Sequence, residues 1–416
     1  MVAGDDARGL ALYRVRLLHV IPSVSERHGG PSQAIKAFAK ASKATGIEVT
    51  VATTDDDGDH ARLDVSLGNA IEQDGVPHFF FRRDLLPYKV SFGLQRWLNE
   101  HIKEFDVVHI HALFSFSSTM AARIARQNKV PYVVRPLGVL NQWGIRNRRR
   151  IPKLVSLWLV ELPILLNSAA IHFTSEGERK EAALLDARLA EHESAVIPLP
   201  IEQRAWSTEQ GAESGQQFLV GFPRARGKQV VLFLSRIDRK KGIELLIDAF
   251  AMVRENNQDV ALVIAGDGEK AYVRELRERG RRVDHEREHE HDDVIWTGHL
   301  SGEMKAAALA AADVFVLPSA SENFGIAAAE SLAAGVPTIV SEEVALSSDI
   351  RQYDAGVVVK RDVQQLASAI NDLLSNKEKA ATLTANGRRL VQELYSPEAV
   401  GKALHYLYQD CVGSET

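Results

Sequence analysis

Short apolar segments rich in β-branched residues alternate with amphipathic segments along most of this chain of 416 residues. Apolar runs separated by stretches with helical spacing, such as 32–46, are typical of strands and helices in turn. Strands that are apolar on both faces belong to parallel sheets buried between two helix layers. The pattern therefore predicts a doubly wound α/β fold, with strands in the first half at 16–22, 48–54, 106–112, 132–138 and 169–175.

The alternation is interrupted once, by a polar stretch that contains Gly and Ser and follows Glu202. It resumes with apolar segments at 230–237, 260–268, 293–300, 313–320, 336–342 and 355–360. We therefore expect two α/β domains, at 1–202 and 229–392, joined by a linker at 203–228. The segment 393–416 has a helical pattern, and we expect it to pack back on the first domain.

Charge and cysteine content narrow the class of protein. The net charge is −5, from 50 Lys and Arg against 55 Asp and Glu, which argues against a nucleic-acid-binding protein. The single cysteine, Cys411, cannot form an intrachain disulfide and fits a reducing compartment. The N-terminus lacks the pattern of a signal peptide, and the apolar run 154–166 is too short to cross a bilayer. These features favour a cytoplasmic protein.

Two glutamates flank a predicted helix start in the second half. Glu322 follows the apolar segment 313–320, and Glu330 lies two helical turns later among Ala, Ser and Leu residues. A carboxylate in such apolar surroundings needs a polar partner, and sugar or ribose hydroxyls are suitable ones. We expect Asn323 to cap the helix, which would expose the N–H groups of residues 324–326.

A basic turn closes the first apolar segment of the second half. It runs Ser235-Arg-Ile-Asp-Arg-Lys-Lys-Gly242 and carries Arg236 and Lys241. The planar fork of arginine and the point charge of lysine together suit a diphosphate. Alone, this turn could equally be a solvated basic loop.

Together these segments identify a family resemblance. The pair Glu322 and Glu330, the basic turn upstream and the Gly266-Asp-Gly sequence between them resemble family 4 of the retaining GT-B glycosyltransferases. The likeness is strong from about Val230 to Val340 and weaker across the first half. It implies two Rossmann-like domains facing across a cleft. It also implies transfer of a sugar from a nucleoside diphosphate sugar with retained anomeric configuration, and no obligatory metal or other cofactor.

The resemblance also implies roles for individual residues. Arg236 and Lys241 would hold the diphosphate and support the leaving group, and Glu322 would contact the hydroxyls of the donor sugar. Glu330 would bind the ribose hydroxyls. The remaining donor-binding positions in the second half would be Gly266, Thr297, Gly298, Phe324, Gly325 and Ile326.

The first half adds weaker signals. Gly29 and Gly30 form a loop that lets backbone approach a phosphate, and the absence of G-x-G-x-x-G argues against a dinucleotide-binding oxidoreductase. In the family, His111 matches a histidine near the anomeric centre of the donor. We expect His109 and His111 to lie on opposite faces of their strand, with His109 packed in the core. Arg135 could bind a phosphate or an acceptor carboxylate, or form a salt bridge.

Two further patterns concern membranes and metals. The basic cluster Arg148–Arg150 precedes an apolar stripe and could contact anionic lipid headgroups, although a core helix beside a solvated turn also fits. His285–His289 matches the zinc motif H-E-x-x-H, but its surroundings are polar on every side, so we expect no metal site there.

One departure from the family pattern concerns the donor sugar. The family often has a Gly-Gly and a Pro-Glu pair where this chain has 343–350, with the sequence EVALSSDI, which leaves the identity of the sugar open. The main hypothesis is transfer to an acceptor of polysaccharide or glycolipid synthesis, which would be a glycan, a lipid-linked sugar or a small molecule. The alternatives are a phosphorylase or nucleotide-sugar epimerase of the same fold, or a non-catalytic protein that binds nucleotide sugars.

Overall fold

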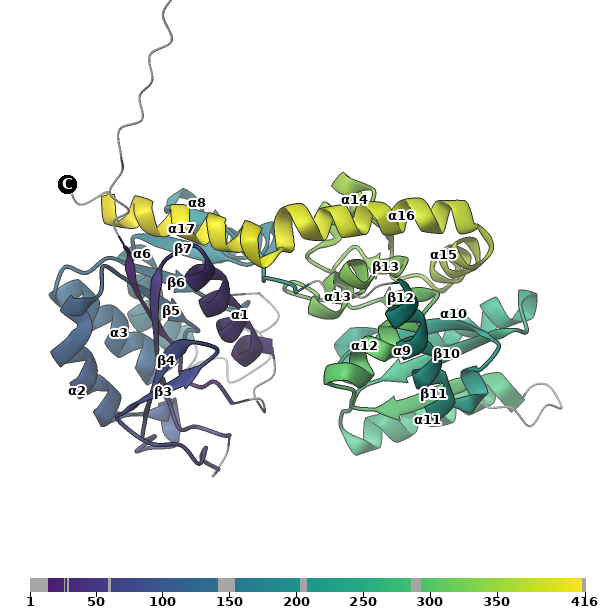
Figure 1. Ribbon diagram of the computed structural model, residues 1–416, viewed down its shortest axis with the longest axis horizontal. Coiled ribbons are helices and arrows are strands. Elements are labelled where there is room, and N and C mark those ends of the chain that lie inside the picture. The colour runs from purple at the N-terminus through teal and green to yellow at the C-terminus, as the bar shows by residue number, and fades with distance from the viewer. Residues whose placement is uncertain are drawn as a thin grey trace, which may run out of the picture. The chain divides into compact units, whose positions relative to one another are not determined.

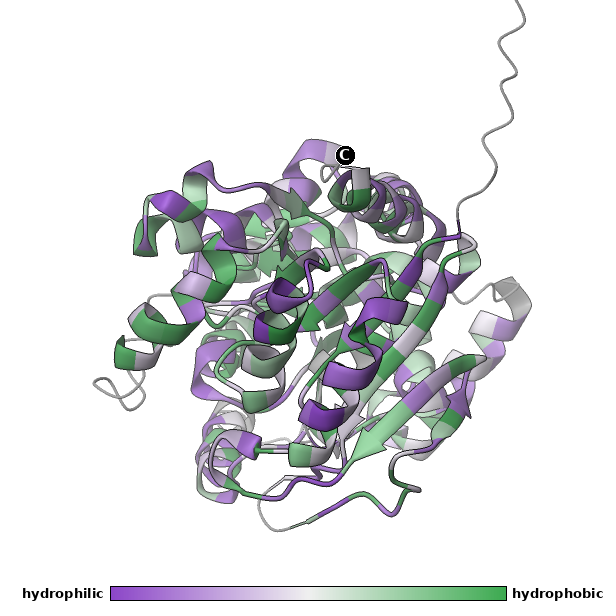
Figure 2. Cartoon of the chain, turned by 90° about the vertical axis from the view of Figure 1, so that its left-hand side faces the viewer, coloured by the Kyte–Doolittle hydropathy of each residue, from purple (hydrophilic) through white to green (hydrophobic). Residues whose placement is uncertain are grey.

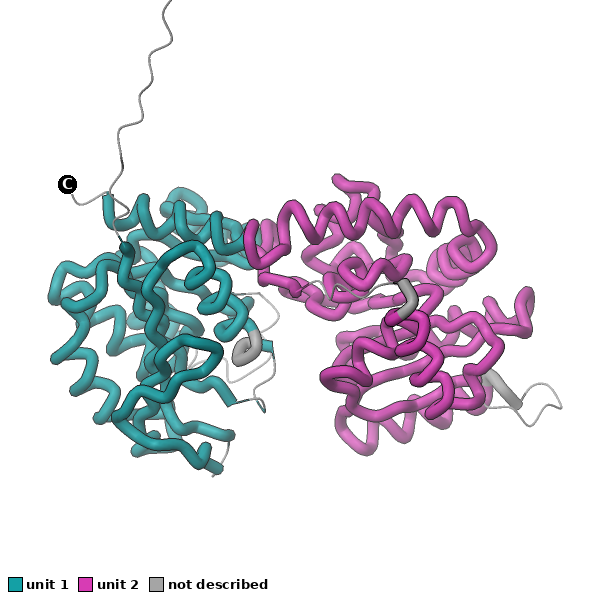
Figure 3. Tube along the Cα trace, viewed as in Figure 1, with its two compact units in different colours: residues 1–174, 178–197, 400–416 teal, residues 175–177, 198–399 magenta. Residues whose placement is uncertain are grey.

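The computed structural model describes residues 14–25, 27, 30–58, 61–140, 154–202, 208–285 and 293–413 (Figure 1). The chain divides into two compact units, shown in Figure 3. Unit 1 comprises Met1–Thr174, Glu178–Ile197 and Val400–Thr416, and unit 2 comprises Ser175–Gly177 and Pro198–Ala399. Each unit contains a mainly or wholly parallel sheet between helices, which confirms the predicted α/β class.

The strands of unit 1 are β1 (Arg16–Val20), β2 (Glu48–Thr54), β3 (Ala70–Gln73), β4 (Val76–Phe81), β5 (Val107–His111), β6 (Tyr132–Arg135), β7 (Ala170–Phe173) and β8 (Ser194–Val196). Among the described residues they form one sheet in the order β3-β4-β2-β1-β5-β6-β7-β8. Only the β3–β4 pair in this sheet is antiparallel. The predicted strands correspond to β1, β2, β5, β6 and β7. Their sequences reveal them because strands that are buried on both faces form apolar runs.

Helices cover this sheet. They are α1 (Gly30–Ala44), α2 (Phe92–His101), α3 (Phe116–Gln127), α6 (Leu162–Leu166), α7 (Glu176–Leu185) and α8 (Arg188–Glu191), with short segments η2 (Pro87–Lys89), η3 (Ile102–Glu104) and π-helical η4 (Leu157–Glu161). Serines begin two of the helices: Ser91 caps α2, and Ser115 caps α3 by accepting from Ser118 N at 3.2 Å. Figure 2 shows the hydrophobic residues concentrated in the strands.

Unit 2 contains β9 (Gln229–Leu234), β10 (Val260–Ala265), β11 (Val294–Gly298), β12 (Val314–Leu317), β13 (Thr338–Ser341) and β14 (Val357–Val359). The described strands form a parallel sheet in the order β11-β10-β9-β12-β13-β14. All six correspond to predicted apolar segments. The order reverses between β9 and β12, which makes this point the topological switch of the sheet.

The helices of unit 2 are α9 (Thr208–Gly221), α10 (Ile243–Asn256), α11 (Lys270–His285), α12 (Gly302–Ala310), α13 (Ile326–Ala334), α14 (Ser347–Tyr353), α15 (Val363–Ser375) and α16 (Lys377–Leu390), with η5 (Pro223–Ala225), η6 (Arg239–Lys241) and π-helical η7 (Val391–Tyr395). We expected the segment 203–228 to be a linker. Where the structure describes it, from residue 208 onward, it instead forms α9 and η5. Its helix α9 packs on α12 so closely that a Cβ at Gly215 would lie 3.0 Å from Ala310 O. A polar composition concealed a helix that belongs to unit 2.

The C-terminal helix α17 (Pro397–Gly413) follows η7. From Val400 onward this helix belongs to unit 1. Gly401 lies against α1, where an added Cβ would be 2.5 Å from Ala41 O. Inside unit 1 the Tyr408 hydroxyl reaches His109 Nδ1 at 2.8 Å. No helix among the described residues has the length and apolar character needed to span a bilayer.

Candidate functional site

The carboxyl ends of β9 and β12 form the candidate ligand-binding edge of unit 2. Parallel α/β sheets bind ligands at the carboxyl ends of their strands where the strand order reverses. The loop after β9 carries the basic turn 235–242, and the loop after β12 carries Glu322. The sequence therefore places its two strongest motifs side by side at the switch point.

Backbone contacts hold these two loops together. Asp238 caps η6 by accepting a hydrogen bond from Lys240 N at 3.0 Å, and Ala320 N donates to Lys240 O at 2.6 Å. Gly242 has a φ of 69°, and a Cβ there would collide with Pro318 O. Only glycine satisfies both the left-handed backbone and this close approach.

The approach brings Lys241 and Glu322 into contact. Lys241 Nζ donates to the Glu322 carboxylate, and the Lys241 side chain is only 7% exposed. Burial lowers the pKa of Lys241, and the negative charge of Glu322 opposes this shift. Arg236 is exposed, and its positive charge also lowers the pKa of Lys241, so the structure brings all three predicted residues together.

The predicted glycines lie at the same edge. Gly266 has a φ of 150°, and a Cβ at this position would collide with Ser235 O. Gly266 N donates to Gly298 O at 2.8 Å, and the hydroxyl of Thr297 donates to the same carbonyl at 3.0 Å. The ends of β9, β10 and β11 are thus joined through backbone positions that leave little room for side chains.

Helix α13 begins beside this edge. Gly325, with a φ of 95°, is the residue before the helix, so the expectation that Asn323 caps it is wrong. The first N–H groups of a helix, here from Ile326 onward, have no partner within the helix and carry positive partial charge. Phe324 is buried and packs edge-on against Tyr395, with ring centroids 5.2 Å apart. Its ring is therefore part of the core, and its backbone is the part available to a ligand.

Glu330 has a protein partner that the sequence did not indicate. Its Oε1 lies 2.5 Å from Lys305 Nζ on α12, and its side chain is 24% exposed. Lys305 therefore supplies the polar partner that the sequence analysis expects from substrate hydroxyls. The role of Glu330 in ribose binding stays a prediction, with Lys305 as the group that orients the carboxylate.

The loop after β13, which departs from the family pattern, supports Glu322. Ala345 N donates to Glu322 O at 3.0 Å, and Glu322 N donates to Glu343 O at 3.3 Å. In the first turn of α14, which follows this loop, Asp349 Oδ2 accepts a hydrogen bond from Tyr395 OH at 2.5 Å. The unusual sequence at 343–350 therefore fixes the backbone of a predicted sugar-binding residue.

In unit 1, His109 and His111 share a face of β5, so the expectation of opposite faces is wrong. Residues two apart on a strand point the same way, and these two ring centroids are 4.2 Å apart. Both side chains are fully buried. His111 Nε2 lies 2.8 Å from His19 Nδ1, which makes it an interior residue here, and its proposed contact with a donor stays a prediction.

The histidine cluster, which we define as His19, His109, His111 and His172, lies inside unit 1. His172 Nδ1 lies 3.3 Å from His109 Nε2, and His172 Nε2 donates to Ile197 O at 2.7 Å. Burial lowers the pKa of His19 and His172 to about 3 and that of the other two well below 6.5. The four imidazoles are therefore neutral at pH 7.

Arg135 is also buried, at 3% exposure, and stacks on Phe38 with 4.6 Å from its guanidinium carbon to the ring centroid. Burial lowers its pKa to about 10, against the favourable charge of Glu178. Its role in acceptor binding stays a prediction. Gly30 is the first residue of α1, whereas Gly29 and the cluster Arg148–Arg150 lie outside the described residues.

A metal has one candidate position among the described residues. His19, His109 and His111 present ligand atoms within 4.8 Å of one another. The positive charge of Arg135 acts on all three, because it contributes to lowering the pKa of each. The same charge disfavours a divalent cation, so we assign the cluster to the core. Of the predicted motif at 285–289, only His285 is described, as the last residue of α11.

Backbone strain marks the carboxyl edge of the unit 1 sheet. Ala112 and Phe114 follow β5 with φ of 80° and 56°, and Leu137 follows β6 with φ of 61°. Non-glycine residues in this region concentrate at functional sites. Sequence reasoning had no signal for these positions, because none is glycine or asparagine.

Comparison with known proteins agrees with this geometry. Residues 220–390 match the model of glycosyl transferases group 1, and residues 29–200 match that of the glycosyl transferase 4-like domain. The chain belongs to the family 4, group 1 glycosyltransferases. The match to the second model covers the part of this family member in which the sequence motifs were weak.

Two curated relatives of this glycosyltransferase act on lipids, according to their names. Alpha-monoglucosyldiacylglycerol synthase of Streptococcus pneumoniae is 34% identical over 188 residues, which are 45% of this chain and 40% of that protein. Phosphatidyl-myo-inositol mannosyltransferase of Mycobacterium leprae is 34% identical over 194 residues, 46% of this chain and 48% of the relative. The aligned region thus spans less than half the length of each relative.

Solved structures show the same fold. Sucrose-phosphate synthase of Thermosynechococcus elongatus superposes with a TM-score of 0.73 at 22% identity, over 96% of this chain and 100% of that chain. HepE of Anabaena, solved with UDP and glucose, gives a TM-score of 0.71 at 18% identity over 95% and 100% of the two chains. These likenesses confirm the GT-B fold.

Proposed function

We propose that this glycosyltransferase moves a sugar from a nucleoside diphosphate sugar to an acceptor of glycolipid or polysaccharide synthesis, with retention of anomeric configuration. The observation that carries the proposal is the Lys241–Glu322 contact at the switch point of unit 2. It joins a cation suited to phosphate and a carboxylate suited to sugar hydroxyls beside the start of α13. The similar structure of HepE from Anabaena was solved in complex with UDP and glucose, which supports a nucleotide-sugar donor.

The chemistry requires charge stabilisation on the leaving group. The bond from the anomeric carbon to the diphosphate oxygen breaks, and both of its electrons go to the diphosphate. Arg236, Lys241 and the first N–H groups of α13 are the groups that would stabilise this charge. The acceptor oxygen then bonds to the same face of the sugar, and its proton passes to the departing phosphate.

Glu322 acts as a binding group in this proposal. A retaining glycosidase uses a free carboxylate as nucleophile to form a covalent intermediate. The Glu322 carboxylate instead bonds to Lys241, and its backbone is fixed on both sides by the loop after β13. This arrangement suits a residue that holds sugar hydroxyls.

We also propose that transfer needs no metal, since two cationic side chains take the place of one. Arg236 and Lys241 lie close enough for one charge to lower the pKa of the other. Activity should therefore survive treatment with EDTA followed by gel filtration. Loss of activity that added Mg²⁺ or Mn²⁺ restores would contradict this part of the proposal.

The acceptor side of the proposal includes a peripheral membrane contact through unit 1. Leu154, Val155, Trp158 and Leu159 lie on one helical segment and are between 41% and 73% exposed. Exposed apolar side chains of this kind, Trp included, insert at the headgroup boundary of a bilayer. The names of the two lipid-modifying relatives support a lipid acceptor.

The test combines donors with lipid acceptors. The protein is incubated with UDP-glucose or GDP-mannose and vesicles that contain diacylglycerol or phosphatidylinositol, and the product anomer is determined by NMR. We expect an α-linked product from an α-linked donor, a loss of at least 100-fold in kcat/KM for Lys241→Met, and near-normal activity for the neighbouring Lys240→Met. An inverted product would contradict retention, and full activity of Lys241→Met would contradict the site.

Vesicle flotation tests the membrane contact separately. We expect Trp158→Ser/Leu159→Ser to reduce flotation with anionic vesicles while the protein keeps its melting temperature. A matched control is Val220→Ser, which removes an exposed apolar side chain, 62% exposed, from unit 2. Equal flotation of the double variant and the wild type would refute the contact.

A further inference from the structure

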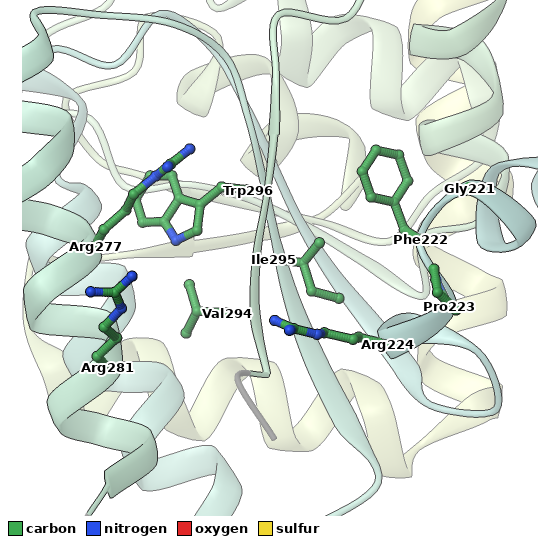
Figure 4. Close-up of a pocket in the computed structure, with 9 residues that line it drawn as sticks. All are labelled: Gly221, Phe222, Pro223, Arg224, Arg277, Arg281, Val294, Ile295 and Trp296. Carbon is green, nitrogen blue, oxygen red and sulfur yellow. The ribbon is translucent and has the colours of Figure 1, made fainter. Parts of the chain in front are cut away.

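A pocket lies at the outer edge of the unit 2 sheet, apart from the candidate donor site. It has a volume of about 340 Å³ and is formed by η5, α11 and the edge strand β11 (Figure 4). Its lining consists of three arginines, two aromatic residues and small or apolar residues: Gly221, Phe222, Pro223, Arg224, Arg277, Arg281, Val294, Ile295 and Trp296. None of these is a predicted donor residue, and the pocket lies along β11 toward its N-terminal end.

The three arginines approach the pocket from two sides. Arg277 and Arg281 are one helical turn apart on α11, and Arg224 extends from η5 on the other side of β11 (Figure 4). All three are exposed, and the described lining residues include no carboxylate. Like charges one turn apart on a helix destabilise it, so this arrangement favours an anion in the pocket.

The floor of the pocket is apolar and aromatic. Val294 and Ile295 are buried at 1% and 7% exposure, and Trp296 is half-buried. The guanidinium carbon of Arg277 lies 5.6 Å from the Trp296 ring centroid, which orients this cation beside an aromatic face. An aromatic surface next to guanidinium groups suits a ligand with a ring at one end and an anionic group at the other.

We propose that this pocket is a second ligand site, which binds a phosphate monoester carried on a ring, such as a sugar phosphate or a nucleotide. A phosphate monoester carries between about −1.5 and −2 charges at pH 7 and three acceptor oxygens, which can engage several guanidinium forks at once. A carboxylate carries a single charge and two oxygens, so it would engage fewer guanidinium groups than a phosphate monoester. The volume lies within the usual range for small-molecule sites. The inference does not depend on the proposed transfer reaction.

Calorimetric titration of the full chain tests the site. The probes are glucose 6-phosphate and uridine 5′-monophosphate, with inorganic phosphate to test the anion alone and uridine to test the ring alone. Every titration is repeated in the Lys241→Met variant, so that binding at the donor edge is separated from binding at this pocket. We expect at least one ring phosphate to bind in both backgrounds, and to bind more tightly than either inorganic phosphate or uridine.

Variants then locate the binding. Arg277→Gln/Arg281→Gln should weaken binding of the ring phosphate at least tenfold, because two charge-assisted contacts are lost. Trp296→Leu should reduce the preference for ring phosphates over inorganic phosphate. Arg274→Gln, an exposed arginine on the same helix that does not line the pocket, is the matched control and should leave binding unchanged.

Two results would overturn the proposal. The first is an affinity for every probe that the arginine double variant leaves unchanged while its melting temperature equals that of the wild type. The second is equal affinity for inorganic phosphate and for the ring phosphates, which would reduce the pocket to a surface anion contact. Melting temperatures of all variants without ligand separate loss of binding from loss of fold.

Discussion

The histidine cluster of unit 1 predicts that the protein loses stability as the pH falls below 6.5. Its members are buried and neutral, with pKa values lowered to about 3 for His19 and His172. In the unfolded chain the same groups return to about 6.5. Between these two values the unfolded state binds more protons than the folded state, so stability falls as the pH falls. Above pH 6.5 both states are neutral, and the cluster adds no pH dependence.

The size of the effect follows from these pKa values. At pH 5, each histidine that is protonated only when unfolded costs about 2 kcal/mol of stability. His19 and His172 together cost about 4 kcal/mol. His109 and His111, whose pKa values also lie well below 6.5, add a further cost of the same sign. These costs are comparable with the whole stability of a typical domain, so unit 1 should unfold first in acid.

Proton uptake on unfolding is the assay, because it does not require a two-state transition. The chain is unfolded by urea at pH 5 in weak buffer, and the protons taken up are titrated for the wild type and for His172→Gln. We expect the variant to take up about one proton fewer per chain, since one proton-binding group is absent. Phe38→Leu is the control: it disturbs packing against His172, with ring centroids 5.3 Å apart, but removes no titrating group. Equal proton uptake by the wild type and His172→Gln would show that His172 does not gain a proton on unfolding.

Three further predictions concern unit 2. Gly242→Ala should lower stability by about 1–3 kcal/mol, because its left-handed backbone is strained for alanine and its Cβ meets Pro318 O, as measured by thermal unfolding; no change would contradict the close approach. Lys305→Met keeps Glu330 but removes the cation that orients its carboxylate, so the variant should bind the donor more weakly in calorimetry. An affinity equal to that of the wild type would show that Lys305 does not orient the carboxylate. Tyr395→Phe should lower the free energy of unfolding by about 1 kcal/mol through loss of its hydrogen bond to Asp349 in α14, and a stability equal to that of the wild type would contradict that bond.

The strands were predictable because parallel strands are buried on both faces. Runs such as 260–265 and 314–317 are continuously apolar, and every residue in them is buried. Neither β3 nor β4 was predicted: β3 is an exposed edge strand without an apolar run, and Pro77 and His78 interrupt the apolar residues of β4. The edge strands β11 and β14 of unit 2 were predicted, so an uninterrupted apolar run, rather than a central place in the sheet, decided the outcome.

The part of the candidate site that could be predicted from sequence consists of residues in the two loops that follow β9 and β12. Arg236, Lys241 and Glu322 come from adjacent loops at a switch point, which strand order alone brings together. The Lys305–Glu330 ion pair could not be predicted from sequence. The two residues lie on different helices, so helical periodicity does not relate their positions.

Contacts between residues distant in sequence were also unpredictable in the core of unit 1. His109 meets Tyr408 across 299 residues of sequence, and no local pattern encodes such a contact. The error over His109 and His111 had a different origin: a period of two places residues i and i+2 on one face, and the structure shows their rings together.

Donor binding at the switch point of unit 2 can be measured by its effect on thermal stability. Thermal unfolding is followed with UDP, GDP, ADP and CMP and with their common sugar conjugates, for the wild type and for Lys241→Met. A ligand at about 100 times its Kd adds about 2.7 kcal/mol of stability, which is a visible shift. We expect one nucleoside diphosphate and its sugar conjugates to stabilise the wild type, and we expect Lys241→Met to lose this shift. No stabilisation by any of them, or an equal shift in Lys241→Met, would contradict this expectation.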